Sequence, residues 1–226
     1  MSNRKPGEPP GIRDARREMY RQQILTAAEY EFARAGFTDA KVTAVAATAD
    51  LSLATLYKSF KSKDEIWNAL VAQRMKELVG LALAATDSVE SPLERIVVGA
   101  RAQVEFFAQH PNFLRLNVKE NWNWATATEA GRGGQRAAWR TGVDMMTHAA
   151  QAAVEAGELT HMRPTVVAGL AISALQVWLT EWINSGTQRS HSHVADELQD
   201  YLRRLLVPPS PTSASPPHDQ RARDGR

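Results

Sequence analysis

The segment "LSLATLYKSFKSKDE", Leu51 to Glu65, combines side chains that favour burial with side chains that bind anions. Leu56 and Phe60 favour burial, whereas Tyr57 and Lys58 carry polar donors. Ammonium and hydroxyl groups contact phosphate oxygens, and short polar side chains on a helix can reach base edges in the major groove. The chemistry indicated is therefore DNA binding, and the alternative is an ordinary amphipathic surface helix with solvated lysines.

Two short helices must position these side chains, one over residues 41–49 and one over residues 53–59, with Ser52 as the N-cap of the second. Two short helices joined by a tight turn form the helix-turn-helix arrangement, whose second helix enters the major groove. We expect Leu56 and Phe60 to face the first helix. The orientation of Leu53 is not decided by the sequence, because its side chain can pack inward or offer its methyl groups to a thymine.

The next element begins with a capping box, in which Ser62 precedes Glu65 by three residues. It predicts a long helix over residues 63–84. The ammonium of Lys63 and the unpaired amides at this helix N-terminus both favour a phosphate oxygen.

Basic residues also concentrate near the start of the chain, although the net charge is only +2. Arg13, Arg17 and Arg21 recur at every fourth position of an expected helix over residues 14–35. This stripe is either a phosphate-contacting surface or a solvated helix face. Its occurrence beside the helix-turn-helix favours nucleic acid.

The composition predicts a soluble, cytoplasmic protein. The 226 residues are 43% hydrophobic and include no cysteine, so there is no disulfide and no thiolate ligand or nucleophile. The N-terminus lacks the apolar core of a signal peptide. The longest apolar stretch, residues 166–183, is interrupted by Gln176 and Glu181, and we interpret it as a buried helix rather than a membrane span.

The pattern predicts an all-α fold of about nine helices. Further helices are expected near residues 92–110, after Pro111, and over 134–156, 164–185 and 192–206. The expected domains are a disordered arm (1–12), a three-helix DNA-binding domain (13–62), a helical ligand-binding and dimerisation domain (63–206) and a Pro/Ser-rich disordered tail (207–226).

From Arg21 to about Leu70 the chain contains, in order, "ILTAA", Phe32, "GF", "VAATA", "LS" and "ATLY", followed by Phe60, Lys63 and Ile66. In this order and spacing the segment resembles the DNA-binding domain of the TetR family of bacterial transcriptional regulators. The resemblance implies phosphate contacts from Thr43 and Ser52, base contacts from Leu53, Thr55 and Lys58, and backbone anchoring by Tyr57 and Lys63.

Four residues, at three sites, depart from the family pattern. Ala40 and Lys41 replace the Thr or Ser that usually precedes the first short helix, so its cap and phosphate contact are altered. Asp50 occupies the turn position that is usually Gly, where Asp tolerates the left-handed region. Ser59 stands where His is common.

The rest of the chain, by the same resemblance, forms a ligand-sensing and dimerising domain. The helix over 164–185 is apolar nearly all round, which indicates burial on two sides. The expected dimer interface comprises Leu175, Trp178, Leu179, Trp182, Leu198 and Leu202, and core packing is an equal alternative for the two tryptophans.

Aromatic and methionine side chains are concentrated between residues 106 and 146. Such side chains with few charges suit a small apolar or aromatic effector. The candidate pocket residues are Phe106, Phe107, Phe113, Trp122, Trp124, Trp139, Met145 and Met146, with core packing as the alternative for each.

The function indicated is a homodimeric regulator that binds palindromic double-stranded operator DNA and is released by a ligand. One alternative is a DNA-binding protein without an effector. A helical enzyme is the other, but His191 and His193 lack a third metal ligand and Asp144 and His148 lack a nucleophile. We expect no enzymatic activity, no cofactor and no metal.

Overall fold

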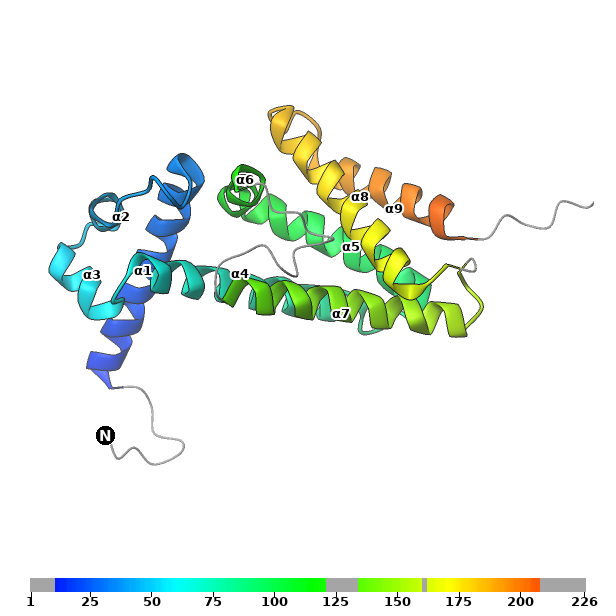
Figure 1. The fold of residues 1–226 in the computed structure, drawn as a ribbon, viewed down its shortest axis with the longest axis horizontal. Helices are drawn as coiled ribbons and strands as arrows, with labels where there is room; N and C mark the ends of the chain where they lie inside the picture. Colours follow the sequence, from blue (N-terminus) through cyan, green and yellow to red (C-terminus); the bar gives the residue numbers. More distant parts are fainter. Residues whose placement is uncertain (1–10, 121–133, 160–161, 208–226) are drawn as a thin grey trace, which may run out of the picture.

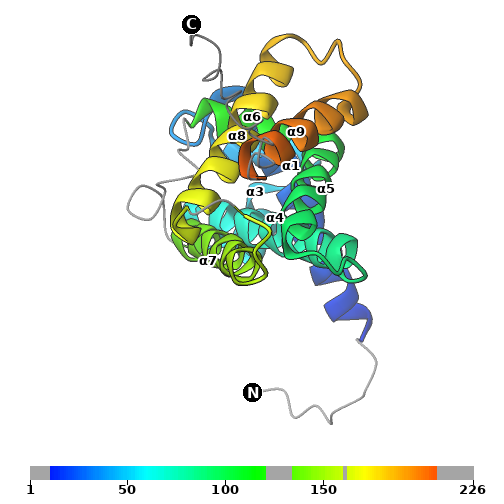
Figure 2. The same ribbon diagram turned by 90° about the vertical axis from the view of Figure 1, so that its right-hand side faces the viewer.

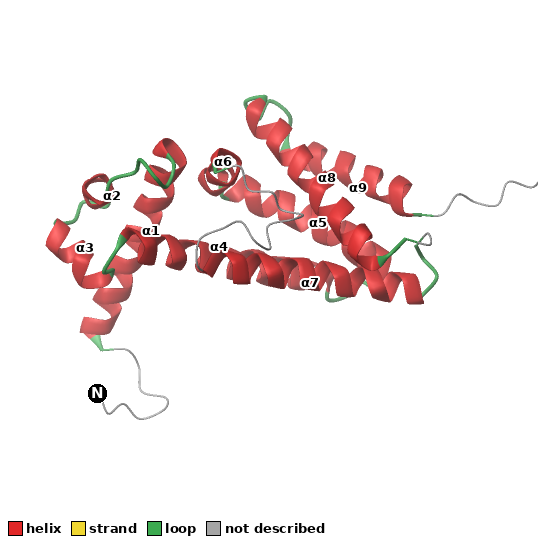
Figure 3. Ribbon diagram, viewed as in Figure 1, coloured by secondary structure: helices red, strands yellow, loops and turns green. Residues whose placement is uncertain are grey.

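The computed structural model describes residues 11–120, 134–159 and 162–207, and the regular elements in these ranges are all α-helices (Figure 3). The all-α prediction is confirmed, and the observed bounds lie within about two residues of the expected ones. In chain order the helices are α1 (Ile12–Ala35), α2 (Val42–Thr48), α3 (Leu53–Ser59), α4 (Lys63–Thr86), α5 (Pro92–Gln109), α6 (Pro111–Lys119), α7 (Gly134–Glu155), α8 (Pro164–Asn184) and α9 (His191–Leu206).

The first three helices form a small head at one end of the molecule (Figure 1). α2 and α3 both pack on α1, and Leu56 and Phe60 of the reading segment are buried as expected. α1 ends at Gly36, whose φ of 83° and ψ of 160° combine a positive φ with an extended ψ. Only glycine adopts this region readily.

Helix α4 connects the head to the remaining helices (Figure 1). Near its start, Trp67 packs edge-on against Phe37, with ring centroids 4.8 Å apart, and against Phe32 at 5.5 Å. Its later turns pack on α5 and α7. Because one continuous helix belongs to both cores, a shift of α4 in one region must reach the other.

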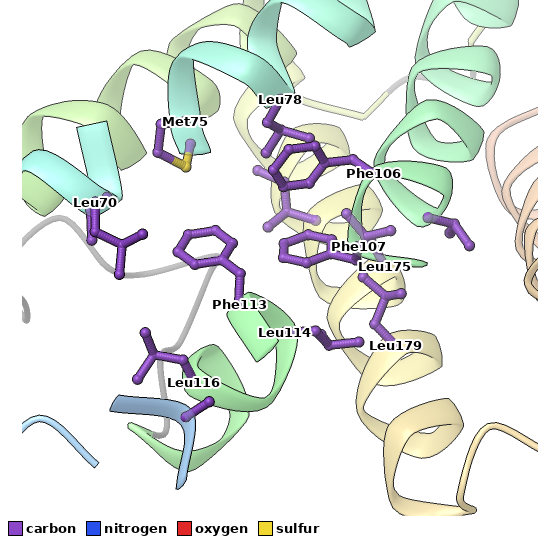
Figure 4. Close-up of a cluster of buried hydrophobic side chains, with 14 of the residues drawn as sticks. Leu70, Met75, Leu78, Phe106, Phe107, Phe113, Leu114, Leu116, Leu175 and Leu179 are labelled. Carbon is purple, nitrogen blue, oxygen red and sulfur yellow. The ribbon is translucent and has the colours of Figure 1, made fainter. Parts of the chain in front are cut away.

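The helices of the larger body pack around α5, which contacts α4, α7 and α9 (Figure 2). Phe106 and Phe107 of α5 meet Phe113 of α6 beside Leu175 and Leu179 of α8 (Figure 4). All five side chains are at most 2% exposed. These rings and leucines are therefore the centre of the body's hydrophobic core.

Helix α8 is the one helix in the described ranges that is long and apolar enough to span a membrane by length and composition. It packs against α5, α6, α7 and α9. This packing on several sides accounts for its apolar character without a bilayer, as expected from the charged and polar residues that interrupt it.

The capping box at the start of α4 forms in part, and so does a second one at the start of α5, where Ser91 precedes Glu94 by three residues. Ser62 and Ser91 each accept a hydrogen bond from the backbone N–H three residues on, at 3.1 Å. The glutamates do not return to the capping serines: Glu65 accepts from the N–H of Lys61, and Glu94 pairs with Arg203 of α9. The boxes thus mark the helix starts correctly, while their carboxylates serve other contacts.

Asp50 occupies the turn between α2 and α3 with a φ of 52°, as its replacement of a turn glycine implies. Replacing Asp50 with valine is expected to lower the free energy of unfolding by about 1–2 kcal/mol, because a β-branched side chain is strained at positive φ. Glycine at the same position should be neutral or slightly stabilising. Urea denaturation measures both.

The matched control for this turn is Asp39→Val, at an exposed aspartate with negative φ. It should change stability by no more than about 0.5 kcal/mol. Equal losses for valine at both positions would show that the backbone conformation of Asp50 is not the cause.

Candidate nucleic-acid interface and ligand cavity

Helix α3 presents a polar and apolar surface to solvent. The Tyr57 side chain is 47% exposed and that of Leu53 is 39% exposed. Lys58, the residue after Tyr57 in α3, is also exposed. The sequence alone did not decide whether Leu53 packs inward or faces DNA, and the structure places its side chain on the outside. A surface that offers a phenol, an ammonium and an aliphatic group suits backbone contact, base contact and a thymine methyl group.

The start of α3 is fixed by its cap. Ser52 Oγ accepts from the N–H of Thr55 at 3.1 Å and lies 2.8 Å from Thr55 Oγ1. The two hydroxyls thus stabilise each other at the helix N-terminus. Each hydroxyl keeps a lone pair that can accept one further hydrogen bond. The predicted contacts of Ser52 with a phosphate and of Thr55 with a base therefore remain predictions that are compatible with the cap.

The start of α2 lacks a comparable cap. Lys41 is the N-cap and makes no side-chain capping bond, consistent with the departure at Ala40 and Lys41. Thr43 is exposed in the first turn, so its predicted phosphate contact is sterically open.

Lys63 begins α4 as predicted, and its ammonium is engaged within the head. Its Nζ donates to the backbone carbonyls of Phe37, Thr38 and Ala40 at 2.7, 2.9 and 3.1 Å, and it sits 4.6 Å from the centroid of the Phe37 ring. An ammonium has three donors, and all three are used. In this structure Lys63 therefore holds the α1–α2 loop, and a role in phosphate binding would require it to give up one of these bonds.

Arg21 has a similar structural role. Its guanidinium donates to the carbonyl of Ser59 at 3.2 Å and lies 4.3 Å from the centroid of the Phe60 ring, so it fixes the end of α3. Arg17, one turn earlier, is exposed. Of these two members of the predicted basic stripe, Arg17 has the side chain that is more accessible to a phosphate.

The α1–α2 loop is also held from the larger body. Glu120, at the end of α6, accepts from the N–H of Phe37 at 2.8 Å, and Lys119 donates to the carbonyl of Arg34 at 2.6 Å. A Cβ added at Gly36 would lie 3.3 Å from the Glu120 carboxylate. Gly36 is therefore needed both for its conformation and for this close approach.

A buried ion pair joins the head to α4. Glu29 of α1 is 5% exposed and accepts from Arg74 Nε at 2.7 Å, while Arg74 also pairs with Glu77 at 2.6 Å. His110, at the α5–α6 junction, lies 3.8 Å from Glu77. Burial and the nearby Arg74 cation lower the pKa of His110, so the neutral imidazole is favoured beside this cluster.

The larger body contains a cavity of about 640 Å³ between α4, α5, α7 and α8. This volume is in the range of small-molecule sites. Its wall is mostly aliphatic and thioether, with Thr86, Asp87, Arg95 and Gln103 as its polar side chains. Met145 and Met146 line it as predicted.

The predicted phenylalanines do not line this cavity. Phe106 and Phe107 lie in a T-shaped pair 5.4 Å apart, and Phe107 stacks on Phe113 at 6.1 Å. They fill the core between α5, α6 and α8, so their assignment to the pocket is corrected to core packing (Figure 4). Trp122 and Trp124 and the Trp139 side chain lie outside the described part of the structure.

The predicted dimer residues mostly face inward. Leu175, Leu179, Leu198 and Leu202 are at most 2% exposed, and Trp182 is buried with its indole N–H donating to the carbonyl of Arg189. Trp178 is half-buried against Tyr201, with ring centroids 4.9 Å apart. The first five are therefore corrected to the subunit's own core, because an all-round apolar helix does not reveal which face is inside.

The exposed apolar side chains of α8 and α9 are different residues, missed from sequence. They are Val166, Leu170, Val177 and Tyr201, and Val177 is 60% exposed. Spacings of four and seven residues place the three α8 side chains on one face. We name this set the α8–α9 outer face.

The residues considered for catalysis are spread out or engaged. The ring of His148 lies 2.7 Å from the backbone carbonyl of Asp144, and His193 lies 3.2 Å from Glu197. Among the residues that the structure describes, no three His, Cys, Asp or Glu side chains cluster as metal ligands.

Comparison with known proteins shows what the N-terminal segment is similar to. Residues 24–70 match the family described as bacterial regulatory proteins, tetR family. The HTH-type transcriptional repressor SCO4008 of Streptomyces coelicolor is 27% identical over 110 residues, which make up 49% of this chain and 54% of that protein. The chain thus spans about half the length of this curated relative.

Solved structures share the fold of nearly the whole chain. The fatty acid degradation regulator FadR from Bacillus halodurans is 15% identical with a TM-score of 0.71, over 87% of this chain and 97% of that one. The ketosteroid transcriptional regulator KstR2 of Mycobacterium tuberculosis is 18% identical with a TM-score of 0.68, over 84% and 95%.

AibR, solved in complex with isovaleryl coenzyme A and operator DNA, is also 18% identical with a TM-score of 0.68, over 84% of this chain and 100% of that one. At these identities the likeness establishes the fold alone. The sequence match, from Ile24 in α1 to Leu70 in α4, shows that this segment is similar to the tetR family of bacterial regulatory proteins.

Proposed function

We propose that the protein is a cytoplasmic, sequence-specific DNA-binding repressor of transcription that binds a palindromic operator as a homodimer and is released by a small apolar effector. The observation that carries the proposal is the capped helix α3, which exposes Leu53, Tyr57 and Lys58 on a helix-turn-helix head. The domains proposed are residues 13–62 for DNA binding and 63–206 for ligand binding and dimerisation.

A homodimer would carry two copies of α3, one for each half-site of a palindromic operator. Two α3 helices would enter successive major grooves about 34–36 Å apart. Soluble monomers usually avoid large exposed apolar patches. The α8–α9 outer face is an exposed apolar surface on which a second copy could pack. A two-fold interface joins the same patch on both copies, so this one face suffices.

Release by a ligand is supported by the cavity and by the path from it to the head. α4 lines the cavity with its later turns and joins the head core with Trp67. A ligand that favours one position of α4 by about 1–3 kcal/mol would shift the separation of the two reading heads. The AibR complex, with its coenzyme A thioester and operator DNA, supports a small-molecule effector.

Three substitutions on α3 test the DNA-binding role. Tyr57→Ala is expected to weaken binding on all sequences, whereas Thr55→Ala and Lys58→Ala are also expected to change sequence preference by about 1–3 kcal/mol at the affected base pair. Fluorescence anisotropy with operator variants measures both effects. Equal losses on every sequence for all three variants would refute the assignment of base-contacting residues.

Binding without an effector is the second candidate. A small-molecule screen in which saturating cavity ligands leave operator affinity unchanged would favour it. The cavity of about 640 Å³ favours the ligand-released mechanism instead.

A further inference from the structure

The chemistry of the cavity narrows the class of effector. We propose that it takes an elongated aliphatic molecule with an uncharged polar head that both donates and accepts hydrogen bonds, such as an amide. The head lies at the α4–α5 end, between Asp87 and Arg95, and the chain runs along α4 towards Met75. This inference rests on the proposed role of the cavity as the effector site.

The wall of the cavity favours a flexible aliphatic body. The side chains that enclose it include Met75 and Leu78 of α4, Val143 and Met146 of α7, and Ile172 of α8, and no aromatic ring is among its lining residues in the described ranges. These residues offer dispersion contact to an alkyl chain but no ring for stacking. Methionine side chains also adapt their shape to a chain of variable conformation.

The direction of the cavity follows α4. Met75 and Thr86 both line it and are eleven residues apart on one helix, which corresponds to about 16 Å of helix rise. On α5, Arg95, Gly99 and Gln103 line it at successive turns. A long, narrow ligand parallel to these two helices fits this arrangement better than a compact one.

The width of the cavity is provided by glycine. A Cβ added at Gly142 of α7 would meet no atom within 4 Å, and one added at Gly99 would approach only Thr86 Cγ2 at 3.9 Å. Both residues line the cavity inside regular helices, where glycine costs about 1 kcal/mol relative to alanine. Their small size therefore leaves open space that an added side chain would fill.

The charges lie at one end and carry both signs. Asp87 follows the last residue of α4, and Arg95 lies in the first turns of α5 with its Nε donating to the carbonyl of Val89 at 2.6 Å. That bond orients the guanidinium and leaves its terminal nitrogens as donors. Asp87 and Arg95 both line the cavity and are both exposed to solvent, so they lie at its mouth, where one offers an acceptor and the other a donor.

A head with one charge would satisfy one of these groups and be repelled by the other. A carboxylate would face Asp87, and an ammonium would face Arg95. An amide accepts from Arg95 through its oxygen and donates to Asp87 through its N–H. Selection of an uncharged head follows from the two opposite charges at the same end.

The test compares octanamide, octanoate and octylamine by calorimetric titration of the full chain without DNA. We expect octanamide to bind about tenfold more tightly than either charged probe. Asp87→Ala should shift the preference towards octanoate, and Arg95→Ala should shift it towards octylamine. Tightest binding of octanoate or octylamine to the native chain, or an unchanged order in both variants, would overturn the proposal.

Substitutions that fill the cavity test where the alkyl chain of the ligand binds. Gly142→Phe is expected to weaken octanamide binding at least tenfold, and the smaller Gly142→Ala should weaken it less while keeping the fold. Gly80→Phe is the matched control, because Gly80 also lies in a helix, has no atom within 4 Å of an added Cβ and does not line the cavity. Equal octanamide affinity in Gly142→Phe and Gly80→Phe would overturn the placement of the chain.

Operator binding by the same variants separates this inference from the proposed function. Gly80→Phe should bind operator DNA and respond to octanamide as the native chain does, whereas Gly142→Phe should lose its response to octanamide. Normal DNA binding with the wrong probe preference refutes only the class of effector, whereas loss of specific DNA binding by the native chain refutes the proposed function.

Discussion

Replacing Arg74 with methionine is expected to lower the free energy of unfolding by about 3–5 kcal/mol, because it leaves the buried carboxylate of Glu29 without its cation. Arg74 donates to Glu29 of α1 and to Glu77 on its own helix, and its side chain is 16% exposed. Urea denaturation followed by circular dichroism measures the loss. It is among the largest effects that a single polar substitution should produce in this chain.

Two controls isolate the buried charge as the cause. The double variant Glu29→Gln with Arg74→Met should recover much of the loss, because no buried unpaired ion remains and the Glu77 carboxylate, 38% exposed, is hydrated. Arg203→Met breaks an ion pair to Glu94 whose side chains are 41% and 36% exposed, and it should cost less than about 1 kcal/mol. Equal losses for Arg74→Met and Arg203→Met would contradict this account of the α1–α4 contact.

Replacing Val177 with glutamate is expected to abolish the dimer at micromolar concentration and to weaken operator binding about 100-fold. A two-fold interface contains the same patch from both copies, so the substitution would bury two carboxylates in an apolar contact. Coupling of two half-sites multiplies affinity by 10²–10⁴, and this factor is lost in a monomer. Sedimentation velocity measures the association, and anisotropy measures operator binding.

Ala84→Glu is the matched control for the outer face, since Ala84 is an exposed alanine on α4. It adds the same charge away from α8 and α9 and should leave the dimer intact. A Val177→Glu protein that still sediments as a dimer would place the interface elsewhere on the molecule.

The sequence predicts the helices well because their signals are local. Ser62 and Ser91 mark helix starts through bonds to residues three positions on, and Asp50 occupies its turn with the positive φ that a replaced glycine implies. Such contacts depend on neighbours in the chain. Burial of Leu56 and Phe60 was also predictable, because a short helix with few apolar residues has one possible inner face.

The long-range contacts were not predictable in the same way. Lys63 looks like a phosphate ligand in sequence, but three carbonyls of the α1–α2 loop take its donors. The partner of Arg74 lies 45 residues away on another helix. A local sequence pattern shows that a cation is present, but it does not show which acceptor binds that cation in the folded protein.

The site in the larger body was predicted in part. Large aromatic residues were expected to line the cavity, yet Phe106, Phe107 and Phe113 fill the core, and the open space borders small residues such as Gly99 and Gly142. The signal that could have found it is glycine within two strongly helical segments, where it costs stability unless space is needed. On α8, uniform apolarity hid the difference between the inner leucines and the exposed Val177.

The central claim is that a dimer of this chain reads DNA through two copies of α3. Selection of bound sequences from a random double-stranded DNA pool by the full-length protein tests it most directly. We predict enrichment of a two-fold symmetric consensus whose half-site centres are about one helical turn, 34–36 Å, apart or a multiple of it. A pool without enrichment, or a single asymmetric site bound by one copy, would contradict the claim.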